Sequence, residues 1–399
     1  MRCRKFQYGL VIFSVFLSWT LFSFGCGSIE MQERFPKTTP RTDDKSQDAS
    51  TEKGNPPSTA PGRSSHKNND SDQVSSNSST ENYKDSISKL NNLIEASTAS
   101  DVMEHLKLLA SDEMEGRAPG SEGGDKAARY ISSLFHNSGL SSPSELSPEY
   151  YQNFSVGTST TQNIIGVLQG KSQSDVVILG AHYDHLGMFG SNVYYGADDN
   201  ASGVSVLLYL AKELSQLKSY LQKTIIFIAF SGEESGLLGS SYYIENPVLP
   251  LKNTSLMINF DMVGYYKRGG LNFIKQGNFT KIPLNISTYC SELSLRCYEK
   301  SSSTETSDHT SFYKASIPAM LIHTGSHIYE HTFNDTVDKI DQDGILKVAT
   351  TSLKIIWDLV GISPTSSNVT ASPQPKQQNQ IRFFNIFPSE ECLNMHNSR

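Results

Sequence analysis

The chain has 399 residues, 37% of them hydrophobic, and a formal net charge of −7. Its mean hydropathy of −0.37 is low for a chain that packs throughout its length, so we expect part of it to lie outside any core. The acidic balance argues against a protein that binds nucleic acid through charge.

The first 26 residues have the features of an export signal. A basic start, MRCRK, precedes an apolar run from Tyr8 to Phe24, and small residues follow. The sequence SFGC resembles a bacterial lipoprotein cleavage site, so we predict a signal peptide over residues 1–26 and a lipid on Cys26 that anchors an exported protein to a membrane of the cell envelope. A secreted protein without lipid is the second expectation, and an uncleaved membrane anchor is the third.

Composition divides the remaining chain into three parts. Residues 27–80 are rich in Ser, Thr, Asn, Asp, Lys and Pro and cannot bury enough apolar surface to fold, so we predict a disordered linker. Residues 363–399 are similar apart from the short apolar stretch IRFFNIF, and we predict a low-complexity tail. Residues 81–362 have the size and composition of one folded domain.

Helical and strand patterns alternate within this domain. Two helical patterns, at 83–96 and 101–111, precede a Gly- and Pro-rich loop and a third amphipathic helix. Further along, apolar runs predict strands at 163–168, 175–181, 224–230, 255–260 and 317–322, with helices at 203–216, 236–245, 285–295 and 343–360. Strands that are apolar throughout and separated by helices indicate an α/β fold, a three-layer sandwich around a mostly parallel mixed sheet.

Cysteine spacing leaves one pairing open. Cys290 and Cys297 lie in a segment with a helical pattern, where two turns would separate their Cα atoms by about 10 Å. That distance exceeds the reach of a disulfide unless the helix breaks. No cysteine spacing in the chain is typical of a thiolate metal site.

Acidic and histidine residues follow the predicted strands. Ligands of such sheets bind beyond the carboxyl ends of the strands, so we expect these side chains to converge. They are His182 and Asp184, Glu233 and Glu234, Asp261, and His327 and His331. His182 and Asp184 are two residues apart in an extended segment, so the Asp184 carboxylate can hydrogen-bond the imidazole and fix its tautomer.

Each of these residues also has a structural explanation. Asp198 and Asp199 could cap the helix that follows them, and Glu233 and Glu234 could complement a helix N-terminus. Capping roles do not explain why so many acidic residues should converge at one edge of the sheet. Carboxylates gathered there repel one another unless cations neutralise them.

The residue types favour metal ions as those cations. Histidine and carboxylate ligands without sulfur suit zinc or a similar divalent ion. Asp199, Glu234 and Asp261 as ligands, with Glu233 as a base, supply four negative charges, which match two divalent ions. A pair of ions that share a water is a recognised hydrolytic device, because the pair acidifies the water and polarises a carbonyl.

Five motifs then establish a resemblance. HYDHLG, GADDNASG, SGEESGLLGS, NFDMVG and EHTFNDTVDKI, in this order, resemble the zinc-dependent aminopeptidases of the M28 peptidase family. DEMEGRAPGSEGGDKAARYI and NIIGVLQG resemble a segment of its exported bacterial members, so the resemblance covers about residues 100–360. It implies a phosphorylase/hydrolase-like zinc exopeptidase fold, a catalytic domain over residues 81–362, two Zn²⁺ ions per chain, and peptide substrates with a free N-terminus.

The resemblance also implies a role for each site residue. The terminal metal ligands would be His182, Glu234, Asp261 and His331, the bridging ligand Asp199, the general base Glu233, and the residue that orients His182 would be Asp184. Family members often have Tyr directly before the last His ligand, whereas this chain has Glu330 there and Tyr329 one step earlier. The oxyanion donor is therefore open, and Tyr329 and His309 are assigned only a place near the pocket.

Several functions compete on this sequence. The first hypothesis is an aminopeptidase in which Glu233 takes a proton from a metal-activated water. The alternatives are a glutaminyl cyclase, a carboxypeptidase, and a non-catalytic receptor or binding module. The intact GADDNASG and EESGLLGS motifs argue against a cyclase, which binds one zinc, and the presence of every ligand and of the base argues against a receptor.

The substrate pocket is less well defined by the sequence. We expect loops near 187–195 and 265–280, with the segment 305–330, to shape it. His185, His323 and His327 are predicted to be structural.

Overall fold

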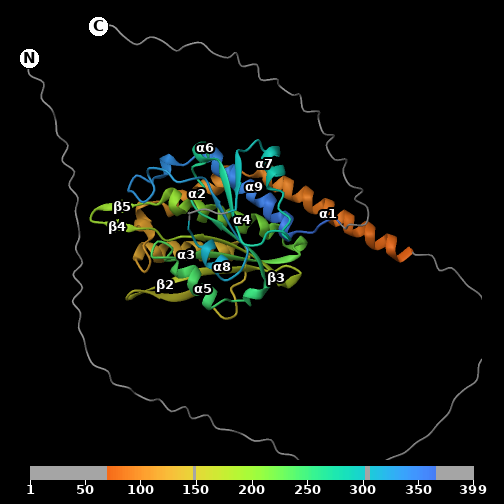
Figure 1. Cartoon of the computed structure of the whole chain (residues 1–399), viewed down its shortest axis with the longest axis horizontal. Coiled ribbons are helices and arrows are strands. Elements are labelled where there is room, and N and C mark those ends of the chain that lie inside the picture. The colour runs from red at the N-terminus through yellow and green to blue at the C-terminus, as the bar shows by residue number, and fades with distance from the viewer. Residues whose placement is uncertain (1–69, 147–149, 302–305, 365–399) are drawn as a thin grey trace, which may run out of the picture. The chain divides into compact units, whose positions relative to one another are not determined.

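The computed structural model describes residues 70–146, 150–301 and 306–364 (Figure 1). The predicted signal peptide, most of the predicted linker and nearly all of the predicted tail lie outside these residues, and remain predictions. Among the described residues, no helix combines the length and the apolar character needed to span a membrane.

Helix α1 (Asp70–Ala96) begins inside the segment predicted to be a linker. The prediction of a disordered linker is therefore wrong from Asp70 onward. Ser86 and Leu90 are buried, so the C-terminal half of the helix packs on the domain. Helix formation is cooperative, and a packed half can support further turns whose own composition is polar.

One mixed sheet forms the centre of the domain. Its strand order is β1-β2-β6-β3-β7-β10-β8-β9. The bounds are β1 Tyr151–Val156, β2 Ser159–Leu168, β3 Ser172–His182, β6 Lys223–Phe230, β7 Thr254–Phe260, β8 Leu271–Gln276, β9 Cys297–Lys300 and β10 Ala319–His323. The four central strands, β6, β3, β7 and β10, run parallel to one another, whereas β1, β2 and β8 each pair antiparallel with a neighbour.

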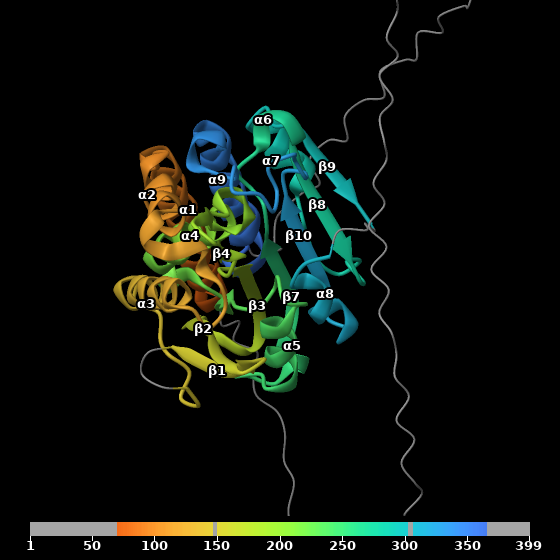
Figure 2. The same ribbon diagram turned by 90° about the vertical axis from the view of Figure 1, so that its left-hand side faces the viewer.

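Helices cover both faces of this sheet (Figure 2). On β3, Val177 and Leu179 join the core beneath one group of helices, and Val176 and Ile178 join the core on the other face. The first face is covered by α2 (Ser100–Leu109), α3 (Glu122–Asn137), α4 (Gly203–Gln216) and α9 (Gln342–Val360), and the second by α5 (Leu238–Glu245) and α8 (His309–Lys314). Burial on both faces explains why the central strands are apolar throughout.

The predicted three-layer α/β class is confirmed, and every predicted strand is present. The predictions missed the two edge strands, β1 and β9, the strand β8 next to β9, and a separate hairpin of β4 (Gly187–Phe189) and β5 (Asn192–Tyr194). These strands are short or partly exposed, so they lack long apolar runs. The segment 265–280, predicted to be a pocket loop, forms α6 (Tyr266–Gly269) and β8.

Cys290 and Cys297 form a disulfide with a Cα–Cα distance of 6.2 Å. The bond is possible because the helix does break: α7 (Ile286–Glu292) ends before Cys297, which is the first residue of β9. The disulfide therefore joins a helix that packs on α9 to the edge of the sheet.

We expect the double substitution Cys290→Ser and Cys297→Ser to lower the free energy of unfolding by about 2–3 kcal/mol, because the bond closes a short loop in the unfolded chain. Urea unfolding of the oxidised protein measures this difference. A reductant should destabilise the wild type by a similar amount and leave the double variant unchanged. Equal stability of the two oxidised proteins would contradict the prediction.

Candidate metal centre

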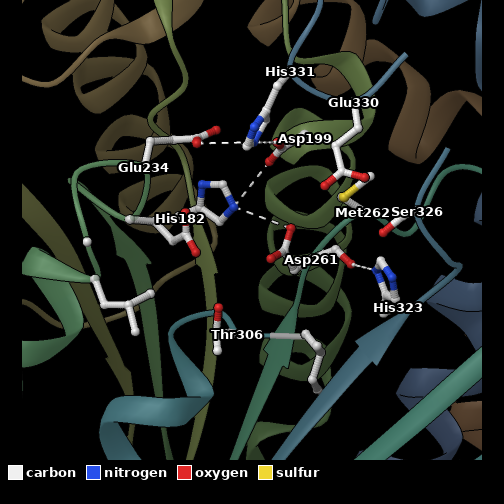
Figure 3. Close-up of a pocket in the computed structure, with 14 residues that line it drawn as sticks. His182, Asp199, Glu234, Asp261, Met262, Thr306, His323, Ser326, Glu330 and His331 are labelled. Carbon is white, nitrogen blue, oxygen red and sulfur yellow. Dashed lines mark hydrogen bonds and ion pairs between the residues drawn. The ribbon is translucent and has the colours of Figure 1, made fainter. Parts of the chain in front are cut away.

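The central parallel strands deliver acidic and histidine side chains to one cavity (Figure 3). His182 is the last residue of β3, Glu233 and Glu234 follow β6, and Asp261 directly follows β7. His331 lies on the loop after β10. These five side chains and Asp199 line a cavity of about 430 Å³, at the carboxyl ends of the parallel strands.

Asp199 lies in an irregular turn, Ala197–Ser202, that leads into α4. The neighbouring Asn200 fixes the turn against β7, because its Nδ2 donates to the Phe260 carbonyl at 2.9 Å and its Oδ1 accepts from the Gly203 amide at 2.9 Å. Gly203 is required at this contact: a Cβ there would lie 2.3 Å from Asn200 Oδ1 and 2.4 Å from the Phe260 carbonyl oxygen.

A first donor set contains His182, Asp199 and Asp261. His182 Nε2 lies 3.4 Å from Asp199 Oδ1 and 3.3 Å from Asp261 Oδ1. Glu233 adjoins this set, since one of its carboxylate oxygens lies within 4.8 Å of ligand atoms from His182 and Asp261. The set therefore has the composition of a divalent-metal site, with the further carboxylate of Glu233 beside it.

A second donor set contains His331, Asp199 and Glu234. His331 Nε2 lies 3.0 Å from Asp199 Oδ2 and 3.2 Å from Glu234 Oε2. Asp199 thus turns one carboxylate oxygen toward each set. A carboxylate in this position can bridge two ions.

His185 was predicted to be structural, but it lies against the second set. Its Nδ1 is 2.8 Å from Glu234 Oε1 and 3.8 Å from Asp199 Oδ2, and its ring is buried. The sequence signal for this position is that His185 directly follows Asp184, three residues after the end of β3.

The predicted hydrogen bond between the Asp184 carboxylate and His182 is wrong. The Asp184 carbonyl oxygen lies 3.2 Å from His182 Nδ1, whereas the nearest carboxylate oxygen lies at 3.8 Å. The carboxylate accepts instead from the backbone amides of Glu233 at 3.2 Å and Glu234 at 3.4 Å. Asp184 still orients His182 through its main chain, because a Nδ1–H bonded to a carbonyl leaves the Nε2 lone pair directed at the cavity.

The crowded charges shift the pKa values of these groups. Burial raises the pKa of Glu233 to about 9, although the charge of His182 opposes the shift. Burial would lower the pKa of His182, but the charges of Asp261 and Glu233 raise it well above its usual value. Hydrogen bonds to Asp199 and Glu234 raise the pKa of His331 to about 11. In the metal-free chain, protons on the two imidazoles therefore supply positive charge that the carboxylates require.

The donor sets fit divalent metal ions. Each combines a histidine nitrogen with carboxylate oxygens and no sulfur, as zinc and similar ions prefer. A metal ion would replace protons on His182 and His331, since metal binding requires the neutral imidazole. Each set offers three donor residues, and Asp199 contributes to both.

His309 and Tyr329 were assigned only a place near the pocket. His309 is fully buried and Tyr329 packs its ring against His327, and neither lines the cavity. Tyr329 does, however, directly precede the lining residue Glu330. The assignment of the two residues to a place near the pocket stays a prediction. The segment 305–330, which was expected to shape the pocket, does line it through Thr306, His323, Ser326 and Glu330, so His323 is not only structural as predicted. Met262, which the sequence did not single out, also lines the cavity. None of the lining residues comes from the segments 187–195 or 265–280.

Arg117 lies fully buried beneath the centre and was not predicted to have a role. Its guanidinium donates to four backbone carbonyls, at distances of 2.5–2.9 Å: those of Leu109, Tyr183, Tyr195 and Gly196. Burial lowers the pKa of Arg117 to about 10, while the charges of Asp199, Asp335 and Asp184 oppose that shift. The side chain therefore stays cationic at neutral pH and holds the chain next to His182 and ahead of Asp199.

The fold and the donor sets define a three-layer α/β protein with a candidate metal centre at its strand ends. Residues 163–356 match the family model described as peptidase family M28. Aminopeptidase YwaD of Bacillus subtilis is 44% identical over 108 residues, which are 26% of this chain and 22% of that protein. Leucine aminopeptidase 1 of Fusarium vanettenii is 28% identical over 218 residues, 49% of this chain and 55% of that protein. The matched part of this chain therefore spans about half of the length of the Fusarium relative and less than a quarter of the length of YwaD.

Solved structures share the fold. The LapA aminopeptidase of Legionella pneumophila has a TM-score of 0.55 and 20% identity over 69% of this chain and 75% of its own. BSAP, a zinc aminopeptidase from Bacillus subtilis, has a TM-score of 0.53 and 18% identity over 66% of this chain and 96% of its own. Glutaminyl cyclase of Porphyromonas gingivalis has a TM-score of 0.52 and 23% identity over 65% of this chain and 98% of its own. Residues 163–356 are a peptidase family M28 domain.

We expect Arg117→Met to lower the free energy of unfolding by about 3 kcal/mol or more, because four backbone carbonyls lose a charged donor. Urea unfolding measures the loss. Arg129→Met is the matched control, since Arg129 is exposed on α3, and it should change stability by less than about 0.5 kcal/mol. Similar stabilities of the two variants would show that the four hydrogen bonds contribute little.

Proposed function

We propose that this chain is a metal-dependent aminopeptidase that hydrolyses the N-terminal peptide bond of peptides. The observation that supports this function best is the pair of donor sets that share Asp199, with Glu233 beside them in one cavity. The M28 domain and the names of the aminopeptidase relatives agree with it.

The proposed cofactor is two Zn²⁺ ions per chain. His182, Asp199 and Asp261 would hold one ion and His331, Asp199 and Glu234 the other. When bound, such a pair lowers the pKa of a shared water and polarises the scissile carbonyl. Its charge would also offset that of the four carboxylates at the site.

Glu233 is the proposed general base. Its carboxylate adjoins His182 and Asp261. Its backbone amide donates to Asp184, which fixes the start of the loop after β6. Glu233 would take a proton from the attacking water and deliver it to the leaving amine. The adjacent Glu234 faces His185 and His331, so the two neighbouring glutamates serve different atoms.

Two alternatives are less well supported. A carboxypeptidase needs a cation for the carboxylate of its substrate, and no Lys or Arg is among the described residues that line the cavity. The glutaminyl cyclase fold resembles this chain about as well as the aminopeptidase folds, so the fold does not separate them. The second donor set favours the aminopeptidase, because the cyclases were expected to bind one zinc.

We also propose that the protein is exported, and that a lipid on Cys26 attaches it to a membrane. The disulfide between Cys290 and Cys297 supports export, since such bonds persist in oxidising compartments. Mass spectrometry of the mature N-terminus would test the lipid.

We expect the purified protein to contain two zinc ions per chain, and a chelator to abolish hydrolysis of aminoacyl-arylamides. Asp199→Asn should reduce the content below one ion per chain, because Asp199 contributes to both sets. Elemental analysis measures the content. Asp343→Asn, on the exposed first turn of α9, is the control and should retain both ions. Full metal content in Asp199→Asn would remove Asp199 from the bridging role.

We expect Glu233→Gln to lower kcat by about 10²- to 10⁴-fold with unchanged metal content, because glutamine cannot accept the proton. Steady-state kinetics on leucyl-arylamide, with elemental analysis of the same sample, makes the comparison. Glu245→Gln, on the exposed end of α5, is the matched control. Retained activity in Glu233→Gln would exclude it as the base.

A further inference from the structure

Five carboxylates line the cavity of the candidate metal centre: Asp199, Glu233, Glu234, Asp261 and Glu330. The proposed function assigns the first four to metal binding and proton transfer. Glu330 belongs to neither donor set, and among the described residues only its backbone makes a hydrogen bond: the amide donates to the His327 carbonyl at 3.2 Å. Within the described part of the chain, no Lys, Arg or His nitrogen lies within ion-pair distance of its carboxylate.

His323 supplies a second group without a partner in the same cavity. Its Nδ1 lies 3.0 Å from the Asp261 carbonyl oxygen, which can only accept, so Nδ1 carries the hydrogen. In the neutral ring, Nε2 is then an acceptor. This atom is buried and has no hydrogen-bond partner among the described residues, and the residue is 5% exposed. Buried acceptors of this kind normally have a donor.

The two groups line the same cavity. Glu330, Ser326, Met262 and His323 all line the cavity, and Figure 3 draws them on the same side of the donor sets. The side chain of Met262 gives this region an apolar surface. A ligand that fits it has an aliphatic stem and a head that donates hydrogen bonds and is positively charged.

We propose that Glu330, with the His323 acceptor, selects substrates whose N-terminal residue is lysine or arginine. The inference rests on the proposed aminopeptidase function and names its substrate class. The methylene stem would pack along Met262, and the ammonium or guanidinium head would donate to the Glu330 carboxylate and His323 Nε2. The carboxylates that line the cavity would repel an acidic N-terminal side chain, and no Lys or Arg among the described lining residues offsets them.

The test compares lysyl-arylamide with norleucyl-arylamide, which has a similar stem and the same α-amine but no charged head. For the metal-loaded wild type, we expect kcat/KM to be at least about tenfold higher for the lysyl substrate. Glu330→Gln should reduce this ratio about tenfold, and most of the change should be in KM. Glu245→Gln removes a charge outside the pocket and should keep the wild-type ratio.

A direct binding measurement supplements the kinetics. Calorimetric titration of the metal-loaded protein with L-lysine and with L-norleucine should show tighter binding of L-lysine, and Glu330→Gln should remove that difference. If Glu330 binds the α-amine instead, the variant weakens both ligands equally and leaves the ratio unchanged, which overturns the proposal. An equal preference for both substrates in the wild type overturns it as well.

The two proposals fail in different ways. If the wild type cleaves no aminoacyl-arylamide after zinc is added, the aminopeptidase function is wrong, and the calorimetric comparison still measures whether the pocket prefers a cationic side chain. If the wild type cleaves norleucyl-arylamide as well as lysyl-arylamide, the function stands and the selectivity of Glu330 is wrong.

Discussion

Repulsion among buried carboxylates is the constraint that shapes this domain. Parallel strands bring their carboxyl ends to one edge, so Asp184, Asp199, Glu234 and Asp261 are held close together whether or not a cation is present. Burial raises the pKa of Asp184 to about 6, which shows how strongly the site disfavours further negative charge. Positive charge must therefore come from protonated imidazoles, from metal ions or from a permanent cation.

Arg117 is that permanent cation. A buried guanidinium is costly unless its donors are satisfied, and here backbone carbonyls accept from it. Two of them belong to Tyr183, next to His182, and to Gly196, in the loop ahead of Asp199. Arg117 therefore both reduces the repulsion and fixes two loops that present donor atoms. Main-chain acceptors leave no pattern of residue types, which is why the sequence did not indicate this role.

The sequence predicted those features that depend on local pattern. Apolar runs identified the central strands, and the rule of strand ends brought His182, Glu234 and Asp261 to one edge. Contacts between distant segments were not predictable in this way. The Asp184 carboxylate binds amides after β6 and not the imidazole two residues away, and His331 adopts a positive φ of 55°, which no residue type at that position signals.

The loop that bears His331 is fixed by the same turn that bears Asp199. His327 Nε2 lies 2.9 Å from Asp198 Oδ2, and the Asp335 carboxylate accepts from the backbone amides of Asp198 and Asp199 at 3.0 Å. These contacts hold the loop on both sides of Glu330. A change in the turn would therefore move a donor of the second set and the carboxylate of Glu330 together. Because one pair of loops positions both groups, metal binding and the choice of N-terminal side chain have a common structural basis.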